Sequence, residues 1–328
     1  MKKIYLNVWW WLIVNFNSIL SSQLERFICE KNSNEYHIKN IVYYLRDFDK
    51  YLIEIDYKYN YLIKDVVYNY IDSKENCIDS TKSRYASLLR QLGIYMYNYD
   101  NKSYILPHKR YSRNYDFTPH IYTEEEIIKI FDSIKNGYYR TKPKIQRQIY
   151  LITKILFSTG MRIGEVLNLK KENFNNIKYT LLLEKTKNNS ERLVVINEAL
   201  SNEIKLYIDD YPSNYEYIFE RNYHQKYTPA LYGAYFKKII FKAKIKHNEK
   251  WPRVHDIRHT FTVNSFRNAI KRGEDLNSFL PLLSAYLGHT DLSSTYKYLH
   301  LTTISFPELR EKVSKIVSVE KEIDYDNL

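Results

Sequence analysis

Helical periodicity constrains this chain more than any other feature of its sequence. Between residues 22 and 104, apolar side chains recur every three or four positions, which places them on one face of successive helices. The two clearest runs are Ile38, Ile41, Val42, Leu45, Phe48, Leu52 and Ile55, and then Tyr61, Leu62, Val66, Val67 and Ile71. A later run, which Ser80 or Thr81 could cap, carries Tyr85, Leu88, Leu89 and Leu92. Residues 22–104 are therefore predicted to form a small domain of four or five helices.

The first 21 residues need a separate interpretation. Lys2 and Lys3 precede an apolar run over residues 8–14, as in a signal peptide, but asparagines interrupt the apolar stretch and no small-residue cleavage site follows. The run is also too short to span a bilayer. We expect residues 1–21 to be an apolar helix or extension that packs on the domain behind it, and the protein to be cytoplasmic.

Residues 105–120 are basic, contain Pro107 and Pro119 and lack apolar periodicity, so they are predicted to be a linker. A capping box from Thr123 to Glu126 then opens a helix and starts a second domain, residues 121–305. In this domain, strand-like runs at 179–183 and 193–196 predict a β-hairpin. The expected fold is mainly α, with a small antiparallel β-sheet. A C-terminal helix and acidic tail follow over residues 306–328.

The formal charge of +12 over 328 residues suggests a polyanionic partner. Lysine, asparagine, tyrosine and isoleucine are over-used throughout, so an AT-rich coding bias would also raise this charge. The residues that would suit a DNA backbone are Lys82, Arg84 and Arg90 in the helical domain and Lys109, Arg110 and Arg113 in the linker. Each of them would equally suit a solvated surface.

Three stretches of the second domain carry side chains that can hold a phosphate diester and attack it. They lie at 158–167, 255–261 and 287–300, and the candidate site residues in them are Arg162, Glu165, His255, Arg258, His289 and Tyr298. Arginine forks match phosphate oxygens and neutralise the charge that grows in the transition state. A tyrosine, with an ordinary pKa of about 10, needs such positive surroundings or a nearby base to attack at neutral pH. A lysine at the hairpin tip, such as Lys187, could protonate the poor leaving group.

These stretches resemble the tyrosine recombinases, the integrase family. Ser158-Thr159-Gly160-Met161-Arg162-Ile163-Gly164-Glu165 is similar to the first arginine box of that family, His255-Asp256-Ile257-Arg258 to its His-x-x-Arg box, and Leu287-Gly288-His289 with Tyr298 to its final box. The resemblance covers roughly residues 120–305. It implies a catalytic domain there and a SAM-like, DNA-clamping helical domain before it.

The resemblance also implies a role for each residue. Tyr298 would be the nucleophile that forms a 3′-phosphotyrosyl link, and Arg162 and Arg258 would hold the non-bridging oxygens. Lys187 would give the proton to the 5′-oxygen. His255 and His289 would complete the phosphate pocket, and Glu165 would support the site from behind. Lys185 is an alternative for the lysine, although counting back from Arg192 favours Lys187. The family works on double-stranded DNA without a metal or cofactor. Exchange of two duplexes implies a homotetramer on DNA. No membrane partner is expected.

Other interpretations remain open from the residues alone. The same fold could serve a DNA-binding regulator or a type IB topoisomerase. His255 and His259 lie four apart on one helix face, as in zinc hydrolases, but aspartate stands where those sites use glutamate and no third ligand is evident. Tyr296 competes with Tyr298 as the nucleophile, and only the spacing from His289 selects Tyr298.

Overall fold

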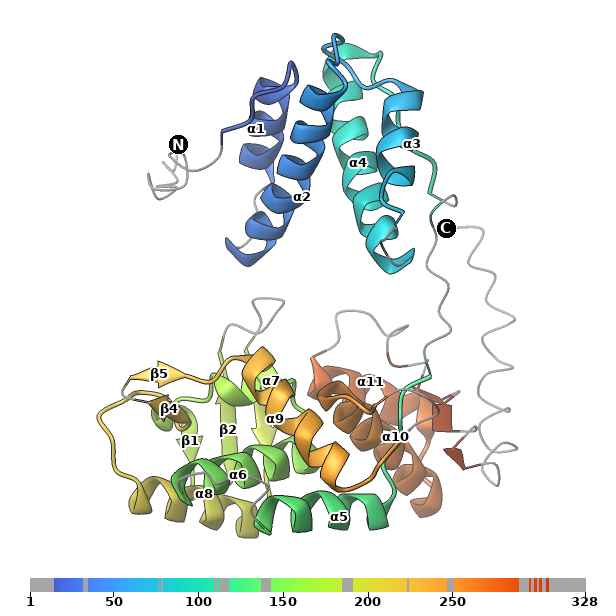
Figure 1. Cartoon of the computed structure of the whole chain (residues 1–328). Coiled ribbons are helices and arrows are strands. Elements are labelled where there is room, and N and C mark those ends of the chain that lie inside the picture. Colours follow the sequence, from blue (N-terminus) through green and yellow to red (C-terminus); the bar gives the residue numbers. More distant parts are fainter. Residues whose placement is uncertain are drawn as a thin grey trace, which may run out of the picture. The chain divides into compact units, whose positions relative to one another are not determined.

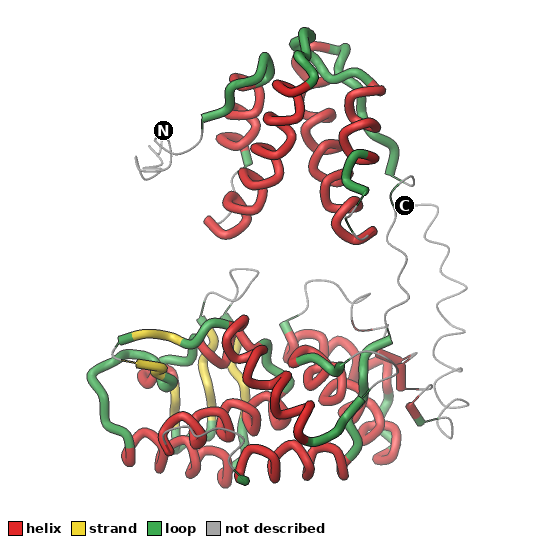
Figure 2. The backbone as a smooth tube through the Cα atoms, in the orientation of Figure 1, coloured by secondary structure: helices red, strands yellow, loops and turns green. Residues whose placement is uncertain are grey.

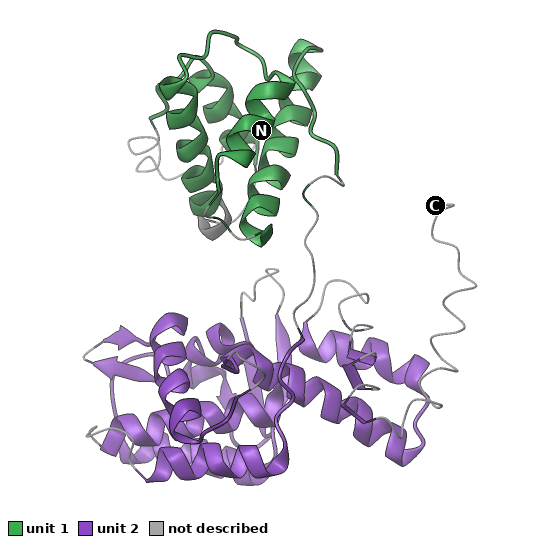
Figure 3. Cartoon of the chain, turned by 45° about the vertical axis from the view of Figure 1, so that its right-hand side comes forward, with its two compact units in different colours: residues 1–117 green, residues 118–328 purple. Residues whose placement is uncertain are grey.

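The computed structural model describes residues 15–31, 35–75, 77, 79–108, 111, 118–136, 143–184, 191–222, 224–246 and 251–288, together with residues 295, 298, 299, 301, 302, 305 and 306. The chain divides into two compact units, residues 1–117 and 118–328 (Figure 3). The described residues are mainly helical and include small antiparallel sheets (Figures 1 and 2). This confirms the predicted fold class.

The described part of the first unit contains four helices around an apolar core. They are α1 (Ser21–Glu30), α2 (Glu35–Glu54), α3 (Lys64–Asp72) and α4 (Asp79–Asp100). The residues that set the predicted periodicity are largely the buried ones, with Leu45, Phe48 and Ile71 almost fully enclosed. The predicted cap of α4 is wrong, because this helix already includes Ser80 and Thr81 and begins at Asp79.

Residues 15–20 precede α1 without forming a helix. The backbone N–H groups of Asn17 and Ser18 donate to the Asp49 carboxylate on α2, at 2.9 and 3.0 Å. These bonds satisfy backbone donors that a helix would otherwise pair internally. Phe16 and Leu20 are buried in the core of the unit. Residues 1–14 lie outside the described part of the chain.

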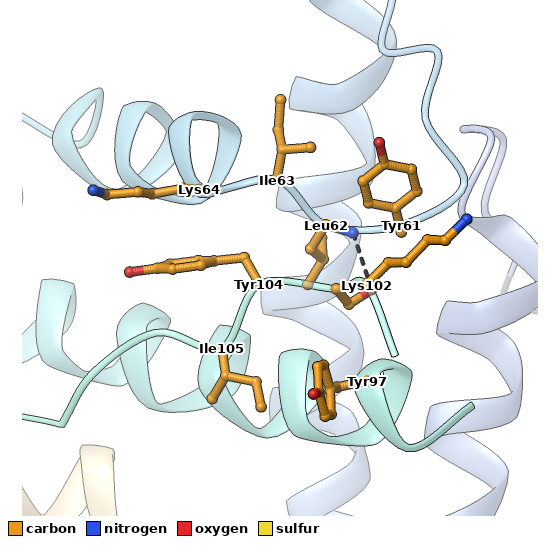
Figure 4. Close-up of a pocket in the computed structure, with 9 residues that line it drawn as sticks. Tyr61, Leu62, Ile63, Lys64, Tyr97, Lys102, Tyr104 and Ile105 are labelled. Carbon is orange, nitrogen blue, oxygen red and sulfur yellow. Dashed lines mark hydrogen bonds between the residues drawn. The ribbon is translucent and has the colours of Figure 1, made fainter. Parts of the chain in front are cut away.

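A shallow pocket on the first unit lies between the segment that precedes α3 and the segment that follows α4. Figure 4 shows its lining residues, which include Tyr61, Lys64, Tyr97, Lys102 and Tyr104. The Leu62 N–H donates to the Ser103 Oγ at 3.1 Å, and the Leu62 carbonyl accepts from the Tyr104 N–H at 2.8 Å. These two bonds fix the segment before α3 against the segment that follows α4.

The second unit surrounds a three-stranded antiparallel sheet with helices. Its helices are α5 (Glu124–Lys135), α6 (Pro143–Thr159), α7 (Ile163–Leu167), α8 (Glu198–Asp210), α9 (Pro229–Lys242), α10 (Val254–Arg272) and α11 (Leu276–Leu287). The strands β1 (Phe174–Asn175), β2 (Thr180–Leu183) and β3 (Arg192–Val195) lie in the order β1-β2-β3. The predicted hairpin is confirmed as β2 and β3. The short strand β1, the 3-10 turn Lys171–Asn173 and the pair β4 (Glu220–Asn222) and β5 (Gln225–Lys226) were not predicted.

Two apolar clusters hold this unit together. The larger one joins α5, α6, α8 and α9 to the sheet, and the smaller one joins α10, α11 and Tyr298. The capping box predicted at the start of α5 is confirmed, because Thr123 and Glu126 each accept the other's backbone N–H, at 3.2 and 3.0 Å. None of the helices described has a stretch both long enough and apolar enough to cross a bilayer.

Candidate active site

The first site residue, Arg162, stands immediately before α7. The Glu165 carboxylate accepts the Arg162 backbone N–H at 2.8 Å and the Arg162 Nη1 at 2.9 Å. The same glutamate therefore caps the helix and fixes the side chain of the arginine in front of it. The three-residue spacing seen in the sequence corresponds to a real contact, and Arg162 is held at the positive end of a helix.

Arg258, on α10, is only 2% exposed. Its Nη1 donates to the Gly160 carbonyl at 3.0 Å, and its Nη2 donates to the Leu287 carbonyl at 2.7 Å. Burial and the neighbouring charge of Arg162 lower the pKa of Arg258 to about 10. The group is still a cation at neutral pH, and it links the ends of α6 and α11 to α10.

The Leu287-Gly288 pair ends α11 and contacts both arginines. Gly288 has φ +67°, the left-handed conformation that commonly ends a helix at glycine. Its carbonyl accepts Arg162 Nη2 at 3.2 Å, while the preceding carbonyl, that of Leu287, accepts Arg258. Two successive carbonyl groups thus hold two guanidinium groups from different helices side by side.

Tyr298 lies close enough to Arg162 and Arg258 for the charges of both to act on its phenol. Its side chain is packed in the apolar cluster of α10 and α11 and the residue is 6% exposed. Burial raises the pKa of the Tyr298 phenol, while the charge and hydrogen bond of Arg258 and the charge of Arg162 act against this rise. The structure therefore brings three sequence-predicted residues together, one tyrosine and two arginines.

One histidine of α10, His259, lies beside the tyrosine, and a second, His255, lies beside His259. The ring of His259 is 5.4 Å from the ring of Tyr298, centroid to centroid, and 4.8 Å from the ring of His255. The His255 side chain is exposed. Within the described part of the chain, no group of three His, Cys, Asp or Glu residues is placed to hold a metal ion, and the pair on α10 is no exception.

Arg192 is a charged residue of the site that we did not predict. At the start of β3, it donates from Nη1 and Nη2 to the two carboxylate oxygens of Glu165, at 3.0 and 2.7 Å. Burial would raise the pKa of Glu165, but the hydrogen bonds and charge of Arg192, together with Arg162, hold it below its ordinary value. One signal was present in the sequence: strand alternation puts Arg192 on the same inward face as the buried Val194.

The remaining candidates divide into two groups. Arg90 donates to the carbonyls of Leu106 and Pro107 at 2.8 and 3.0 Å, so it fastens α4 to the following segment, while Arg84 is exposed and Lys82 half-buried. The candidates that lie outside the described residues are Lys109, Arg110, Arg113, Lys185, Lys187, His289 and Tyr296.

Known proteins are similar to this chain over more than half of its length. The XerA tyrosine recombinase of Pyrococcus furiosus is 29% identical over 199 residues, which is 60% of this chain and 62% of that relative. The chain thus spans less than two thirds of the length of this relative. A putative integrase/recombinase of Sinorhizobium fredii, y4rE, is 26% identical over 295 residues, which is 87% of this chain and 92% of that protein.

Solved structures extend the likeness to the fold. XerH recombinase bound to a palindromic difH substrate, in a post-cleavage complex, has a TM-score of 0.64 at 25% identity, covering 88% of this chain and 83% of that one. The Tn1549 transposon integrase in complex with circular intermediate DNA has a TM-score of 0.64 at 14% identity, covering 86% and 94%, and shares the fold. The model of the phage integrase family matches residues 121–304, more than half of the chain. The protein therefore belongs to the phage integrase family.

Proposed function

We propose that this chain is a site-specific DNA recombinase that cuts and rejoins DNA through Tyr298. The observation that carries the proposal is the meeting of Tyr298 with Arg162 and Arg258, around the end of α11. The names of the relatives support it, since XerA is a tyrosine recombinase and the XerH structure is a complex with its DNA substrate after cleavage.

In the proposed reaction, the Tyr298 oxygen attacks the scissile phosphorus. The bond from phosphorus to the 5′-oxygen breaks, and a 3′-phosphotyrosyl link takes its place. Lys187, or alternatively Lys185, gives a proton to the departing 5′-oxygen. The 5′-hydroxyl of a partner strand then reverses these steps. No energy cofactor is required, because one phosphoester bond replaces another at each step.

Arg162 and Arg258 would bind the two non-bridging oxygens, where negative charge increases in the transition state. A positioned donor of this kind contributes on the order of 3 kcal/mol. Since burial raises the pKa of Tyr298, the phenol is neutral at pH 7 and must lose its proton during attack. His255 and His289 are proposed to complete the phosphate pocket and to assist this proton transfer.

The test is covalent capture on DNA. A pool of nicked duplexes of randomised sequence is incubated with the protein, and a denaturing gel reports protein that carries DNA. The wild-type chain is expected to be captured, whereas Tyr298→Phe is not, because it lacks the attacking oxygen. Tyr296→Phe and the remote Tyr150→Phe serve as matched controls and should be captured like the wild type. Equal capture of Tyr298→Phe would contradict the proposal.

Exchange between two duplexes needs four such sites, so we propose double-stranded DNA as the partner and a homotetramer as the active assembly. Residues beyond 306 are the segment we expect to reach a neighbouring subunit. A variant that lacks residues 307–328 keeps Phe306, whose ring lies 4.2 Å from the Arg267 guanidinium. It should bind single DNA sites but form no paired complexes in native gels. Recombination at the wild-type rate would refute this assignment.

A further inference from the structure

The carboxylate behind Arg162 is shared by two arginines. Glu165 binds the guanidinium of Arg162 through one oxygen and that of Arg192 through both, while its second oxygen also accepts the Arg162 backbone N–H. The side chains of Glu165 and Arg192 are only 9% and 10% exposed. A bidentate arginine–carboxylate pair fixes the relative orientation of its two side chains. Arg192 comes from the sheet, 27 residues after Glu165, so the contact ties β3 to the start of α7.

The charges of the site explain what this contact does. Besides burial, the charges of Arg162 and Arg192 lower the pKa of Arg258, so the Arg258 guanidinium is repelled by both of the others. A third arginine beside the other two is tolerated because Glu165 neutralises one of them. The cluster of three arginines and one carboxylate keeps a net charge of two, which matches the developing charge of a phosphate in the transition state.

Without Arg192, the buried carboxylate would have Arg162 as its main charged partner. Two outcomes are then open to it, and both harm Arg162. As an anion, Glu165 would draw the Arg162 guanidinium toward itself and away from the phosphate. As a neutral acid, which burial favours, it would release Arg162 from its fixed orientation.

We propose that Arg192 is a positioning residue for DNA cleavage: by occupying both oxygens of Glu165, it holds this carboxylate so that Arg162 faces the scissile phosphate. The inference rests on the proposed function, because it concerns the geometry of the same site. A guanidinium has five N–H donors, so the contacts of Arg162 to Glu165 and Gly288 leave it able to bind phosphate. In the described part of the chain, the hydrogen bonds of Arg192 go to Glu165, so we assign it a role that acts through this carboxylate.

The test compares single-turnover capture of a nicked duplex that the wild-type protein cleaves, between about pH 5 and pH 8. Arg192→Gln should slow capture by about 10- to 100-fold at neutral pH, the equivalent of one lost charge-assisted hydrogen bond. It should also lose further activity as the pH falls, because Glu165 now takes up a proton more readily; this extra loss toward acid pH is the acid limb of the variant. Arg192→Lys keeps a charge beside the carboxylate. It should therefore recover part of the rate and show a much smaller acid limb.

Two controls separate positioning from general loss of stability. In Arg192→Gln combined with Glu165→Gln, the extra acid limb should vanish, because the titrating group is gone. Lys154→Gln removes an ion pair outside the site, the one between Lys154 on α6 and Glu203 on α8, whose side chains are 29% and 27% exposed. It should leave both the rate and the pH profile unchanged. An acid limb that persists in the double variant would assign it to another group and overturn the proposal.

The outcomes are distinguishable from failure of the proposed function. If the wild-type chain captures no DNA, the recombinase assignment fails and the positioning role falls with it. If the wild type captures DNA and Arg192→Gln matches it in rate and pH profile, only the inference is refuted. Should Arg192→Gln not fold, Arg192→Lys and Glu165→Gln decide the matter. Wild-type behaviour of both would overturn the proposal. A slower rate in both, with a small residual loss of activity at acid pH in Arg192→Lys and none in Glu165→Gln, would support it.

Discussion

Replacing Gly288 by alanine should damage the site more than it damages the fold. The residue ends α11 with φ +67°, a conformation that costs an L-residue about 1–2 kcal/mol. In addition, a Cβ atom there would lie 2.7 Å from the Arg192 Nη1, closer than such atoms approach. The end of the Arg192 side chain would have to move, and its two-pronged bond to Glu165 would be broken or weakened.

The chain offers a matched control for this substitution. Gly273 ends α10 with φ +73°, and a Cβ atom there would meet nothing within 4 Å. Gly273→Ala therefore carries the backbone cost alone. Gly288→Ala carries the same cost plus that of a charge-assisted hydrogen bond, about 1.5–3 kcal/mol. For a unit of about 200 residues, this excess corresponds to a further fall in Tm of roughly 3–12 °C.

The assay is thermal unfolding of both variants, followed by covalent capture of DNA at a temperature at which both are folded. We expect Gly273→Ala to cut DNA like the wild type and Gly288→Ala to cut it at least tenfold more slowly, since Arg162 is bound to the Gly288 carbonyl. Equal losses of Tm in the two variants, with wild-type capture by Gly288→Ala, would refute the reasoning.

Three further predictions follow from the charges of the site. Because burial raises the pKa of Tyr298, the rate of capture should keep rising with pH beyond about pH 9, and a flat profile above neutral pH would contradict this. Arg258→Met should lower the free energy of unfolding by about 2–4 kcal/mol in urea titrations, because it leaves the buried carbonyls of Gly160 and Leu287 without their donor. Folding lowers the pKa of Glu165 from its ordinary value of 4.5. The free energy of unfolding that the wild type gains over Glu165→Gln should therefore be fully present above pH 4.5. It should disappear as the pH falls through the pKa that Glu165 has in the folded protein. A stability difference that grows toward acid pH would show that the sign is wrong.

Local rules were enough to predict the helical first unit, the start of α5 and the hairpin of β2 and β3. Apolar periodicity located the buried faces of α2 and α3, and the Thr123–Glu126 pair located the start of α5. Where a backbone is held by a distant side chain, these rules fail. Asp49 lies about 30 residues after the backbone N–H groups that it accepts, and no window of local sequence contains that information. Strands β4 and β5 were missed because they are two or three residues long and lack apolar alternation.

The site was predictable to the extent that its residues occur in recognisable stretches. Arg162, Arg258 and Tyr298 were selected in this way, and the structure brings them together. Arg192 was used only to count positions along the hairpin, because its partner Glu165 lies in another element and no fixed spacing joins the two. His259 was considered only as a metal ligand, although its ring lies against Tyr298. Both omissions concern contacts that exist only after the helices and the sheet have packed.

The last turn of α11 has a mechanical consequence. The Leu287 carbonyl accepts a hydrogen bond from Arg258 on α10, and the Gly288 carbonyl accepts one from Arg162 at the start of α7. Any movement of α11 along its axis would therefore shift both guanidinium groups together. The position of this one helix end therefore sets the positions of both arginines at once.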